Sequence, residues 1–449
     1  MKIKCPPRVG ELMKIALPCF AEQVLLVIAG IISTSIVGQL GKYELTAATM
    51  SNQFVNWLQC VYTGLGTGAT VVVARMWGGG ERDRAKTVFL NSIKLVIIIS
   101  VIVLFLTIMF KEAIIWAFCG GAEQEVIDNI YVYFTYCMLG MPATAICNMI
   151  CASMRGIGDN RTALYTTTCV NVLNLIFSFM FVFGFEPLGI AKMGVMGAGI
   201  AIVVARYMTM LLLVSYIYFS KKPLLPDKYT FGMDMDILKR VMNVGTPTAI
   251  EQFIFNGGFV MLQTLLIGFG TLFQAGYQIG ANFNGIGTAT SMAMSVAMTA
   301  LISSALGKRD WGLAEEYVKA AKFIIWTAFS AICVLMFAVS PLMARVYSND
   351  PLVIEQGIYF CCMFSAYIIP VGYFQAMSGV LRGAGDAKYV AITSVGGLWL
   401  MRIMGTWLLA KLTNNGYIAV TIGVGADFIS RALLYHVRVK KGHWLHIKV

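Results

Sequence analysis

Pro18-Cys19-Phe20-Ala21-Glu22-Gln23 places a proline and a carboxylate inside an apolar run that extends from Leu12 to Val37. The pattern returns as Pro247-Thr248-Ala249-Ile250-Glu251-Gln252, with the shared Pro, Glu and Gln each displaced by 229 positions. A charged side chain in the middle of a membrane costs roughly 3 kcal/mol or more, so a carboxylate kept there is a functional candidate. Two such glutamates at matching places predict a symmetric site that handles ions.

The composition identifies an integral membrane protein. Of the 449 residues, 58% are hydrophobic and only 12% are charged, and the mean hydropathy is +0.75. Soluble domains carry roughly 25% charged residues, so a soluble domain is excluded. We predict an all-α fold of twelve transmembrane helices, each with the about 20 apolar residues that a bilayer core requires. The spans are expected near residues 12–38, 46–74, 88–110, 130–153, 162–185, 195–219, 240–268, 275–306, 320–344, 353–380, 388–411 and 416–437.

The basic residues predict the orientation of the chain. If the N-terminus is cytoplasmic, 27 of the 34 Lys and Arg residues fall on the cytoplasmic side, which is the side that the positive-inside rule favours. We therefore expect a multi-pass protein of the cell (inner or plasma) membrane with both termini in the cytoplasm. The net charge of +12 then reflects topology, and no binding of nucleic acid is expected.

The chain contains an internal repeat. Gly41 matches Gly270 at the offset of 229, and Arg155-Gly156-Ile157-Gly158-Asp159 is repeated as Arg382-Gly383-Ala384-Gly385-Asp386 at an offset of 227. Each predicted half holds an even number of spans, so both copies enter the membrane from the same side. They are parallel repeats, related by an axis along the membrane normal.

A polar stretch divides the two halves. Residues 220–239 form the longest polar segment and lie close to the middle of the chain. We interpret them as a cytoplasmic linker between two six-helix lobes, since domain boundaries fall in such segments. The lobes are expected at residues 1–219 and 240–449, and the second lobe ends in a short cytoplasmic tail.

Glu22 and Glu251 are the candidates for ion coupling. Each follows a proline, Pro18 or Pro247, by four residues, and a proline frees a backbone carbonyl inside a helix. A glutamate desolvated there could exchange a proton or, when ionised, hold Na+ or an organic cation. The alternative is a structural carboxylate that hydrogen-bonds a neighbouring helix. The two prolines are interpreted as structural.

Amide side chains are the candidates for a substrate cavity. Those that directly follow the two glutamates favour hydrogen bonding between helices. Those in the second span of each half lie beside small residues, which permit close packing of helices, so lining a cavity and packing stay equally open. The candidates are Gln23, Gln252, Asn52, Gln53, Gln278, Asn282 and Gln375.

The other notable charges are interpreted as structural. The two Arg-Gly-x-Gly-Asp motifs look like phosphate loops, but no strand precedes them and the nucleotide-binding pattern is incomplete. We interpret them as tight turns between helices. The residues expected to tie down these turns are Arg155, Asp159, Arg382 and Asp386. Asp427 and Arg431 lie four residues apart in the last predicted span and are expected to pair.

No residue set predicts an enzyme, a metal centre or a cofactor. The three histidines all lie near the C-terminus, and the spans show no nucleophile paired with a base. The cysteines of the spans lack a C-x-x-C pair and are interpreted as small buried hydrophobes. An intramembrane enzyme is the weakest alternative, and turnover of a lipid or peptide would be needed to support it.

Several segments resemble the multidrug and toxic compound extrusion (MATE) family, in particular its bacterial NorM- and DinF-like members. They are the Pro-x-x-x-Glu of the seventh span, Ile36-Val37-Gly38-Gln39-Leu40-Gly41, Leu381-Arg382-Gly383-Ala384-Gly385-Asp386, Gly194-Val195-Met196-Gly197-Ala198-Gly199 and Arg438-x-x-x-Gly442-His443-Trp444. The resemblance covers almost the whole chain. It implies efflux of small organic, often cationic, compounds driven by inward Na+ or H+, by two lobes that alternate between inward- and outward-open states. It also maps the seventh-span glutamate of the family onto Glu251, and we expect a monomer in the lipid bilayer.

Two positions depart from the family pattern. Ser33 stands where many bacterial members carry an aspartate in the first span, and Gly372 stands where Na+-coupled members often carry one in the tenth. Glu22 is the candidate to substitute for the first-span acid, and the choice between Na+ and H+ stays open. The alternative function is a lipid-linked precursor flippase of a related superfamily. That function would require a strongly cationic central cavity, whereas the predicted spans hold few cations.

Overall fold

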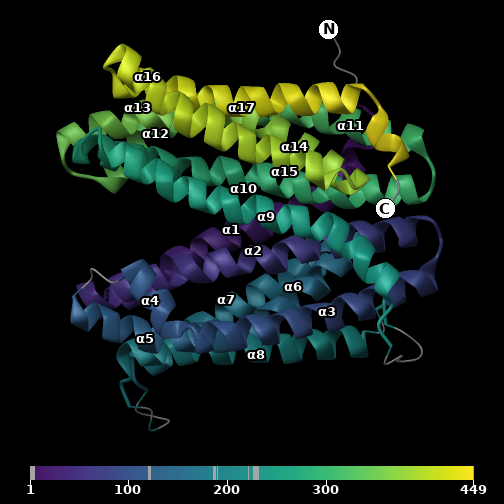
Figure 1. Ribbon diagram of the computed structural model, residues 1–449, viewed down its shortest axis with the longest axis horizontal. Helices are drawn as coiled ribbons and strands as arrows, with labels where there is room; N and C mark the ends of the chain where they lie inside the picture. The colour runs from purple at the N-terminus through teal and green to yellow at the C-terminus, as the bar shows by residue number, and fades with distance from the viewer. Residues whose placement is uncertain are drawn as a thin grey trace. The chain divides into compact units, whose positions relative to one another are not determined.

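The protein is helical in the parts of the chain that its computed structural model describes. These are residues 6–119, 123–185, 189, 191–220, 222–225 and 232–447, and none of them forms a β-strand (Figure 1). Residues 221 and 226–231 of the predicted linker, and the last two residues of the predicted tail, lie outside the described residues. The helical fold class is confirmed.

The described chain forms α-helices and three shorter helical segments of other types. They are α1 (Val9–Gly38), α2 (Lys42–Gly78), α3 (Arg82–Met109), α4 (Lys111–Cys119), α5 (Gln124–Leu139), α6 (Met141–Gly156), α7 (Asn160–Phe183), α8 (Gly194–Phe219), α9 (Met235–Ile267), α10 (Thr271–Gly307), α11 (Trp311–Ile324), η2 (Ile325–Phe329), α12 (Ser330–Tyr347), α13 (Pro351–Ala366), α14 (Ile368–Ala384), α15 (Ala387–Gly396), η3 (Gly397–Met404), α16 (Gly405–Thr413), α17 (Gly416–Lys440) and η4 (His443–His446). Of these, η2 and η3 are π-helical and η4 is a 3₁₀-helix.

Length and apolar composition qualify 10 helical stretches of the described chain as membrane spans. The pair α13 and α14, which is bent by 46°, would make an eleventh. The helix α2 is not among them, although it has 37 residues, and it exposes the amides Asn52 and Gln53. The predicted count of twelve therefore stays a prediction.

The helix bounds follow the repeat that the sequence predicts. The helices α2 and α10 both have 37 residues, and their first residues, like their last, are 229 positions apart. The first residues of α5 and α13, and those of α6 and α14, are 227 positions apart. The two halves thus place their helices at the same offsets as their motifs.

The described helices form two compact units. The C-terminal unit contains Met1–Gln23, Gly78–Gly80 and Thr246–Val449, and the N-terminal unit contains Val24–Trp77 and Glu81–Gly245. Both α1 and α9 contribute to both units, because the boundaries fall inside these helices. Glu22 and Glu251 both belong to the C-terminal unit. The lobe boundaries predicted on either side of the linker stay predictions.

Close helix packing organises the C-terminal unit. The helix α10 packs against α13 and α14, and α14 packs against α17 (Figure 1). A Cβ on Gly379 of α14 would lie 2.3 Å from the carbonyl oxygen of Ser295 on α10, so only glycine permits this approach. The Thr299 hydroxyl of α10 donates to the Gly379 carbonyl at 3.2 Å. Small residues and short hydrogen bonds of this kind hold helices together in lipid.

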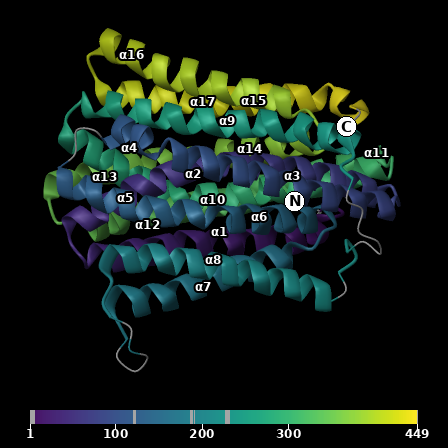
Figure 2. The same cartoon turned by 60° about the horizontal axis from the view of Figure 1, so that its bottom comes forward.

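The N-terminal unit repeats this contact. There α3 packs against α6, and α7 and α8 lie side by side (Figure 2). The Thr70 hydroxyl of α2 donates to the Ala152 carbonyl of α6 at 2.8 Å. Thr70 and Ala152 precede Thr299 and Gly379 by the two repeat offsets, so the repeat extends to individual hydrogen bonds.

Candidate functional site

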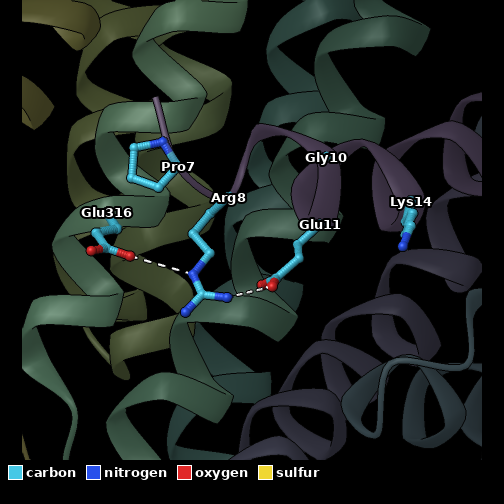
Figure 3. Close-up of a pocket in the computed structure, with 6 residues that line it drawn as sticks. All are labelled: Pro7, Arg8, Gly10, Glu11, Lys14 and Glu316. Carbon is cyan, nitrogen blue, oxygen red and sulfur yellow. Dashed lines mark hydrogen bonds and ion pairs between the residues drawn. The ribbon is translucent and has the colours of Figure 1, made fainter. Parts of the chain in front are cut away.

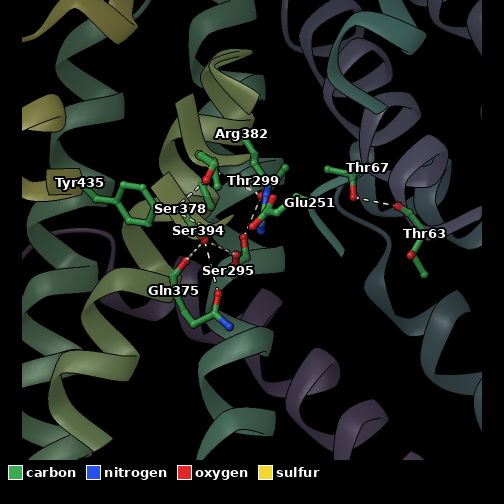
Figure 4. Close-up of polar contacts among 12 residues, drawn as sticks. Thr63, Thr67, Glu251, Ser295, Thr299, Gln375, Ser378, Arg382, Ser394 and Tyr435 are labelled. Carbon is green, nitrogen blue, oxygen red and sulfur yellow. Dashed lines mark hydrogen bonds and ion pairs between the residues drawn. The ribbon is translucent and has the colours of Figure 1, made fainter. Parts of the chain in front are cut away.

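The centre of the candidate site is a buried ion pair. Glu251 lies in α9, four residues after the proline that this helix contains, and its residue surface is only 6% exposed. The Nη2 atom of Arg382, on α14, lies 2.9 Å from Oε1 and 2.8 Å from Oε2 of Glu251 (Figure 4). A charge taken out of water is costly unless it is paired, so each side chain makes the burial of the other possible.

Hydroxyl groups lie in the same part of the C-terminal unit. Tyr435 of α17 is close enough to Glu251 and Arg382 to interact electrostatically with both. Its hydroxyl lies 2.9 Å from Oγ of Ser394 and donates to the Val390 carbonyl at 3.1 Å (Figure 4). The phenol is therefore held in place beside the ion pair.

Gln375, a predicted cavity residue, belongs to a second group of polar contacts on α14. The Ser378 hydroxyl donates to the Gln375 carbonyl at 2.7 Å and lies 3.3 Å from the Ser295 hydroxyl of α10 (Figure 4). Ser295 and Ser378 are buried, whereas Gln375 is half-buried. The structure thus brings Gln375 to the α10–α14 contact.

Glu22 occupies the equivalent position of the first half. It lies in α1, which also continues through its proline, and it is 6% exposed like Glu251. The amides that follow the two glutamates, Gln23 and Gln252, are half-buried. The pair of matching buried carboxylates is thus present in the structure, and their role in coupling stays a prediction.

The predicted cavity amides of the second spans are exposed. This holds for Asn52 and Gln53 on α2 and for Gln278 and Asn282 on α10. The Gln278 amide donates to Asn282 Oδ1 at 3.1 Å and accepts from Gln263 of α9 at 3.3 Å. Polar groups at membrane depth are costly against lipid, so exposed amides in the first third of these long helices favour water-filled surroundings.

The interpretation of the Arg-Gly-x-Gly-Asp turns needs a correction. Gly385 has a φ of +95°, and the N–H groups of Gly385 and Asp386 donate to carbonyls of the preceding helical turn. These backbone bonds close the turn without an arginine side chain. Arg382 reaches Glu251 instead, and Asp386 pairs with Arg438 near the end of α17 at 2.8 Å. Arg382 therefore belongs to the candidate site.

The turn of the first half closes with the same backbone bonds, since Gly158 has a φ of +86° and the N–H groups of Gly158 and Asp159 donate to carbonyls of the preceding helical turn, but its aspartate has other partners. Asp159 caps α7 by accepting from the Thr162 N–H at 3.3 Å, and Lys222 lies 2.7 Å from its Oδ2. Arg155 stands half-buried at the place that corresponds to Arg382. Burial by itself would raise the pKa of the Asp159 carboxyl, but the hydrogen bonds from Lys222 and Thr162 and the lysine charge hold this pKa below its ordinary value.

We expect the variant Asp159→Asn to be less stable than the wild type at about pH 7 and equally stable at about pH 2. Because the folded-state pKa lies below the unfolded-state value of about 3.9, the contribution of Asp159 is fully present above that value. It is lost as the pH falls through the lower folded-state pKa. Thermal unfolding of the purified protein over this pH range measures the difference.

The control for this comparison is Asp83→Asn. The Asp83 side chain is 96% exposed, and its ion pair with Lys86 is long at 3.7 Å. Exposed pairs contribute little to stability, so this variant should match the wild type at both pH values. If Asp159→Asn were as much less stable than the wild type at about pH 2 as at about pH 7, the assignment would be contradicted.

The predicted pair in the last span is confirmed, and it has a third member. Arg431 Nε donates to Asp427 Oδ1 at 2.6 Å. Both residues lie on α17, four positions apart. Arg402 of η3 also reaches the carboxylate, with Nη2 2.7 Å from Oδ2. The sequence offered no partner for Arg402, because the two residues are not spaced as neighbours on one helix.

The packing around Gly372 explains why this position, the second departure from the family pattern, carries no aspartate. A Cβ on Gly372 would lie 2.5 Å from ring atoms of Phe329 in η2. The phenyl ring thus occupies the space into which a longer side chain would extend. An aspartate at this position would require Phe329 to move.

Buried amides of the N-terminal unit are absent from the predicted set. Side-chain atoms of Asn148 on α6, and of Asn171 and Asn174 on α7, are buried without a hydrogen-bond partner among the described residues. Buried polar groups of this kind are uncommon. Only the tertiary packing reveals them, since single amides spread over two spans form no sequence motif.

A separate cavity of about 470 Å³ opens at the start of α1 (Figure 3). Arg8 pairs there with Glu11, and its Nε lies 3.4 Å from Glu316 of α11. With Lys14, the lining carries two basic and two acidic side chains. This balance favours neither cations nor anions.

A comparison with protein-family models matches the MatE family twice, over residues 18–180 and 247–408. The chain is 28% identical over 442 residues to a probable multidrug resistance protein NorM of Thermotoga maritima, covering 97% of this chain and 92% of that protein. It is 23% identical over 409 residues to the multidrug resistance protein MdtK of Pectobacterium atrosepticum, covering 89% and 87%.

The solved structures agree at the level of the fold. The crystal structure of the Vibrio cholerae MATE transporter VcmN in its bent form superposes with a TM-score of 0.87 at 19% sequence identity, covering 97% of each chain. The two family matches begin at Pro18 and Pro247, which are the prolines that precede the buried glutamates. The family domain thus occurs twice, in the register of the internal repeat.

Proposed function

The chain belongs to the multidrug and toxic compound extrusion family of efflux transporters, and we propose that it is a secondary antiporter. It exports small organic, chiefly cationic, compounds in exchange for inward-moving Na+ or H+. The observation that carries this proposal is the buried Glu251 carboxylate with Arg382 as its counter-ion. The same proposal assigns it to the cell membrane as a monomer with both termini in the cytoplasm.

The ion pair supplies a mechanism for coupling. With Arg382 bound, Glu251 is already neutralised by a cation that belongs to the protein. An entering Na+ or H+ must compete with the guanidinium for the two carboxylate oxygens. When the ion displaces the guanidinium, the salt bridge between α9 and α14 opens, and the contacts of α9 with the rest of the C-terminal unit change. Binding of the ion is thereby linked to helix movement.

Coupling requires that the ion bind two conformations with different affinity. In this mechanism the ion favours the conformation in which Arg382 has released Glu251. The membrane potential supplies about 2.3 kcal/mol per charge for each 100 mV, so one inward cation can sustain a large export gradient. Glu22, with the same burial and a matching place in the repeat, is proposed as the second coupling carboxylate.

The test uses purified protein in proteoliposomes loaded with a fluorescent organic cation. Efflux is recorded under an inward Na+ gradient at equal pH, under an inward H+ gradient without Na+, and with both gradients collapsed. We expect one of the two gradients to drive efflux, and substrate-induced proton release in weak buffer to identify H+ coupling independently. Efflux that ignores both gradients would refute antiport.

A further inference from the structure

Three charged side chains meet inside the C-terminal unit at a place that the coupling mechanism does not use. Arg402 of η3 is 2% exposed, Asp427 of α17 is 0% exposed and Arg431 of α17 is 2% exposed. Arg431 binds the Asp427 carboxylate through two nitrogen atoms, and Arg402 Nη2 lies 2.7 Å from Oδ2. We call this group the arginine cluster.

The arginine cluster carries an excess of one positive charge, since two guanidinium groups share one carboxylate. Among the described residues, Asp427 is the only carboxylate that forms an ion pair with the two arginines. Tyr277 of α10 and Tyr435 of α17 interact electrostatically with the cluster, but both are phenols. Glu251, which also interacts with Tyr435, is already bound by Arg382. A buried charge without a counter-ion is expensive, so the cluster is prepared to accept an anion.

Two donor atoms of Arg402 have no hydrogen-bond partner among the described residues, although one of them lies in the ion pair with Asp427. These atoms, Nε and Nη2, are buried, and the contact of Nη2 with Asp427 is close but poorly aligned. Nε–H and Nη2–H point along one edge of the guanidinium plane, which is the edge that binds both oxygens of a carboxylate. One turn further on, the buried Thr406 hydroxyl also has no partner there.

Aromatic rings cover both guanidinium groups. Arg402 lies 4.5 Å from the ring of Phe428 and 5.8 Å from that of Phe259. Arg431 lies 4.7 Å from the ring of Phe374 and 5.2 Å from that of Phe255. Ring faces attract cations and therefore offset part of the excess charge. Phe374 and Phe428 are buried, whereas Phe255 and Phe259 on α9 are half-exposed, so the less buried rings beside the cluster are those of α9.

The backbone allows this arrangement at one glycine. A Cβ on Gly397, the first residue of η3, would lie 2.5 Å from Asp427 Oδ1 and 3.1 Å from Arg431 Nε. The segment that carries Arg402 is π-helical, and π-helical turns inside longer helices are frequent at functional sites. The local backbone geometry thus brings Arg402 to the Asp427 carboxylate, which is already bound by Arg431.

We propose that Arg402 and Arg431, covered by Phe255 and Phe259, form a recognition site for the carboxylate of an aromatic organic compound. This inference rests on the proposed export function and adds a substrate class to it. The carboxylate binds the Nε–H and Nη2–H donors of Arg402, which have no hydrogen-bond partner among the described residues, and supplies the missing negative charge. The aromatic body of the compound lies against the half-exposed rings of α9, where stacking is favourable.

The test compares two planar probes of nearly equal shape on the full-length protein in detergent, by isothermal titration calorimetry. They are 2-naphthoate and its neutral amide 2-naphthamide. We expect 2-naphthoate to bind and the amide to bind about 10- to 100-fold more weakly, as for the loss of hydrogen bonds to charged groups. Equal binding of acid and amide, or no binding of the acid, would overturn the inference without any variant.

Two variants locate the site. Arg402→Gln should weaken binding of 2-naphthoate by about 10- to 100-fold while leaving the Asp427–Arg431 pair neutral. The control is Arg206→Gln in α8, whose guanidinium donates to the Cys137 carbonyl in the N-terminal unit, and it should not change the affinity. Equal effects of the two variants would contradict the assignment to the arginine cluster.

Failure of this inference is distinguishable from failure of the proposed function. If the wild-type protein exports the fluorescent cation under an ion gradient but does not prefer the acid over the amide, only the inference falls. If no gradient drives export, the proposed function falls, whatever the binding measurement gives.

Discussion

We expect Glu251→Gln, made in an Arg382→Gln background, to reduce ion-driven efflux to the rate of protein-free liposomes. The background variant is needed because Glu251→Gln alone would leave the buried Arg382 guanidinium without its only described ion-pair partner, at a cost of about 3–5 kcal/mol. Arg382→Gln keeps an amide donor for the carboxylate, and the double variant has no charge at either position, so neither leaves a buried guanidinium without its partner. The difference in ion-driven efflux between these two variants therefore measures the contribution of the Glu251 carboxylate.

Arg382→Gln alone should keep ion-driven efflux but change its dependence on ion concentration. If the coupling cation competes with the guanidinium for Glu251, removal of the competitor lowers the ion concentration that half-saturates efflux. It also slows turnover, because the ion then leaves less readily. Measurement of efflux against ion concentration in proteoliposomes separates these two effects.

A purely structural ion pair predicts a different pattern. Each single variant would then lose stability, and the double variant would regain both stability and efflux, since two neutral amides can hydrogen-bond to one another. Restored coupled efflux in Glu251→Gln/Arg382→Gln would therefore refute the coupling role. Unfolding temperatures of the three variants, measured alongside efflux, show whether each protein is folded.

Local patterns in the sequence predicted a large part of this molecule. Each predicted span coincides with one helix or with consecutive helices, because apolar runs of the required length identify membrane helices directly. The repeat predicted which helix of one half corresponds to which helix of the other. The contact between Asp427 and Arg431 followed from their spacing on one helix.

The sequence did not predict contacts between segments that lie far apart in the chain. Arg382 lies 131 positions after Glu251, and only the side-chain contact from α14 to α9 identifies it as the partner. Its motif suggested a turn residue, since nothing in the motif indicates that backbone hydrogen bonds already close the turn. The filling of the space beside Gly372 by Phe329 likewise depends on a π-helical segment that hydropathy does not reveal.

We expect Asp427→Asn to cause the largest loss of stability of any single substitution considered for the C-terminal unit. The carboxylate is fully buried and is shared by Arg402 and Arg431. Its removal leaves two guanidinium groups without a counter-ion, and loss of one partner of a buried pair already costs about 3–5 kcal/mol. Thermal unfolding in detergent measures the effect, and the exposed Asp83→Asn serves as the control.

Arg402→Met provides the contrasting result. It removes the excess charge and leaves a neutral Asp427–Arg431 pair, while the methionine side chain can still pack against Phe259 and Phe428. We expect its stability to lie within about 1 kcal/mol of the wild type or to exceed it. A loss as large as that of Asp427→Asn would show that the excess charge is not what strains the cluster. A gain would mean that the chain retains Arg402 at a cost in stability, which is the pattern expected of a residue kept for binding.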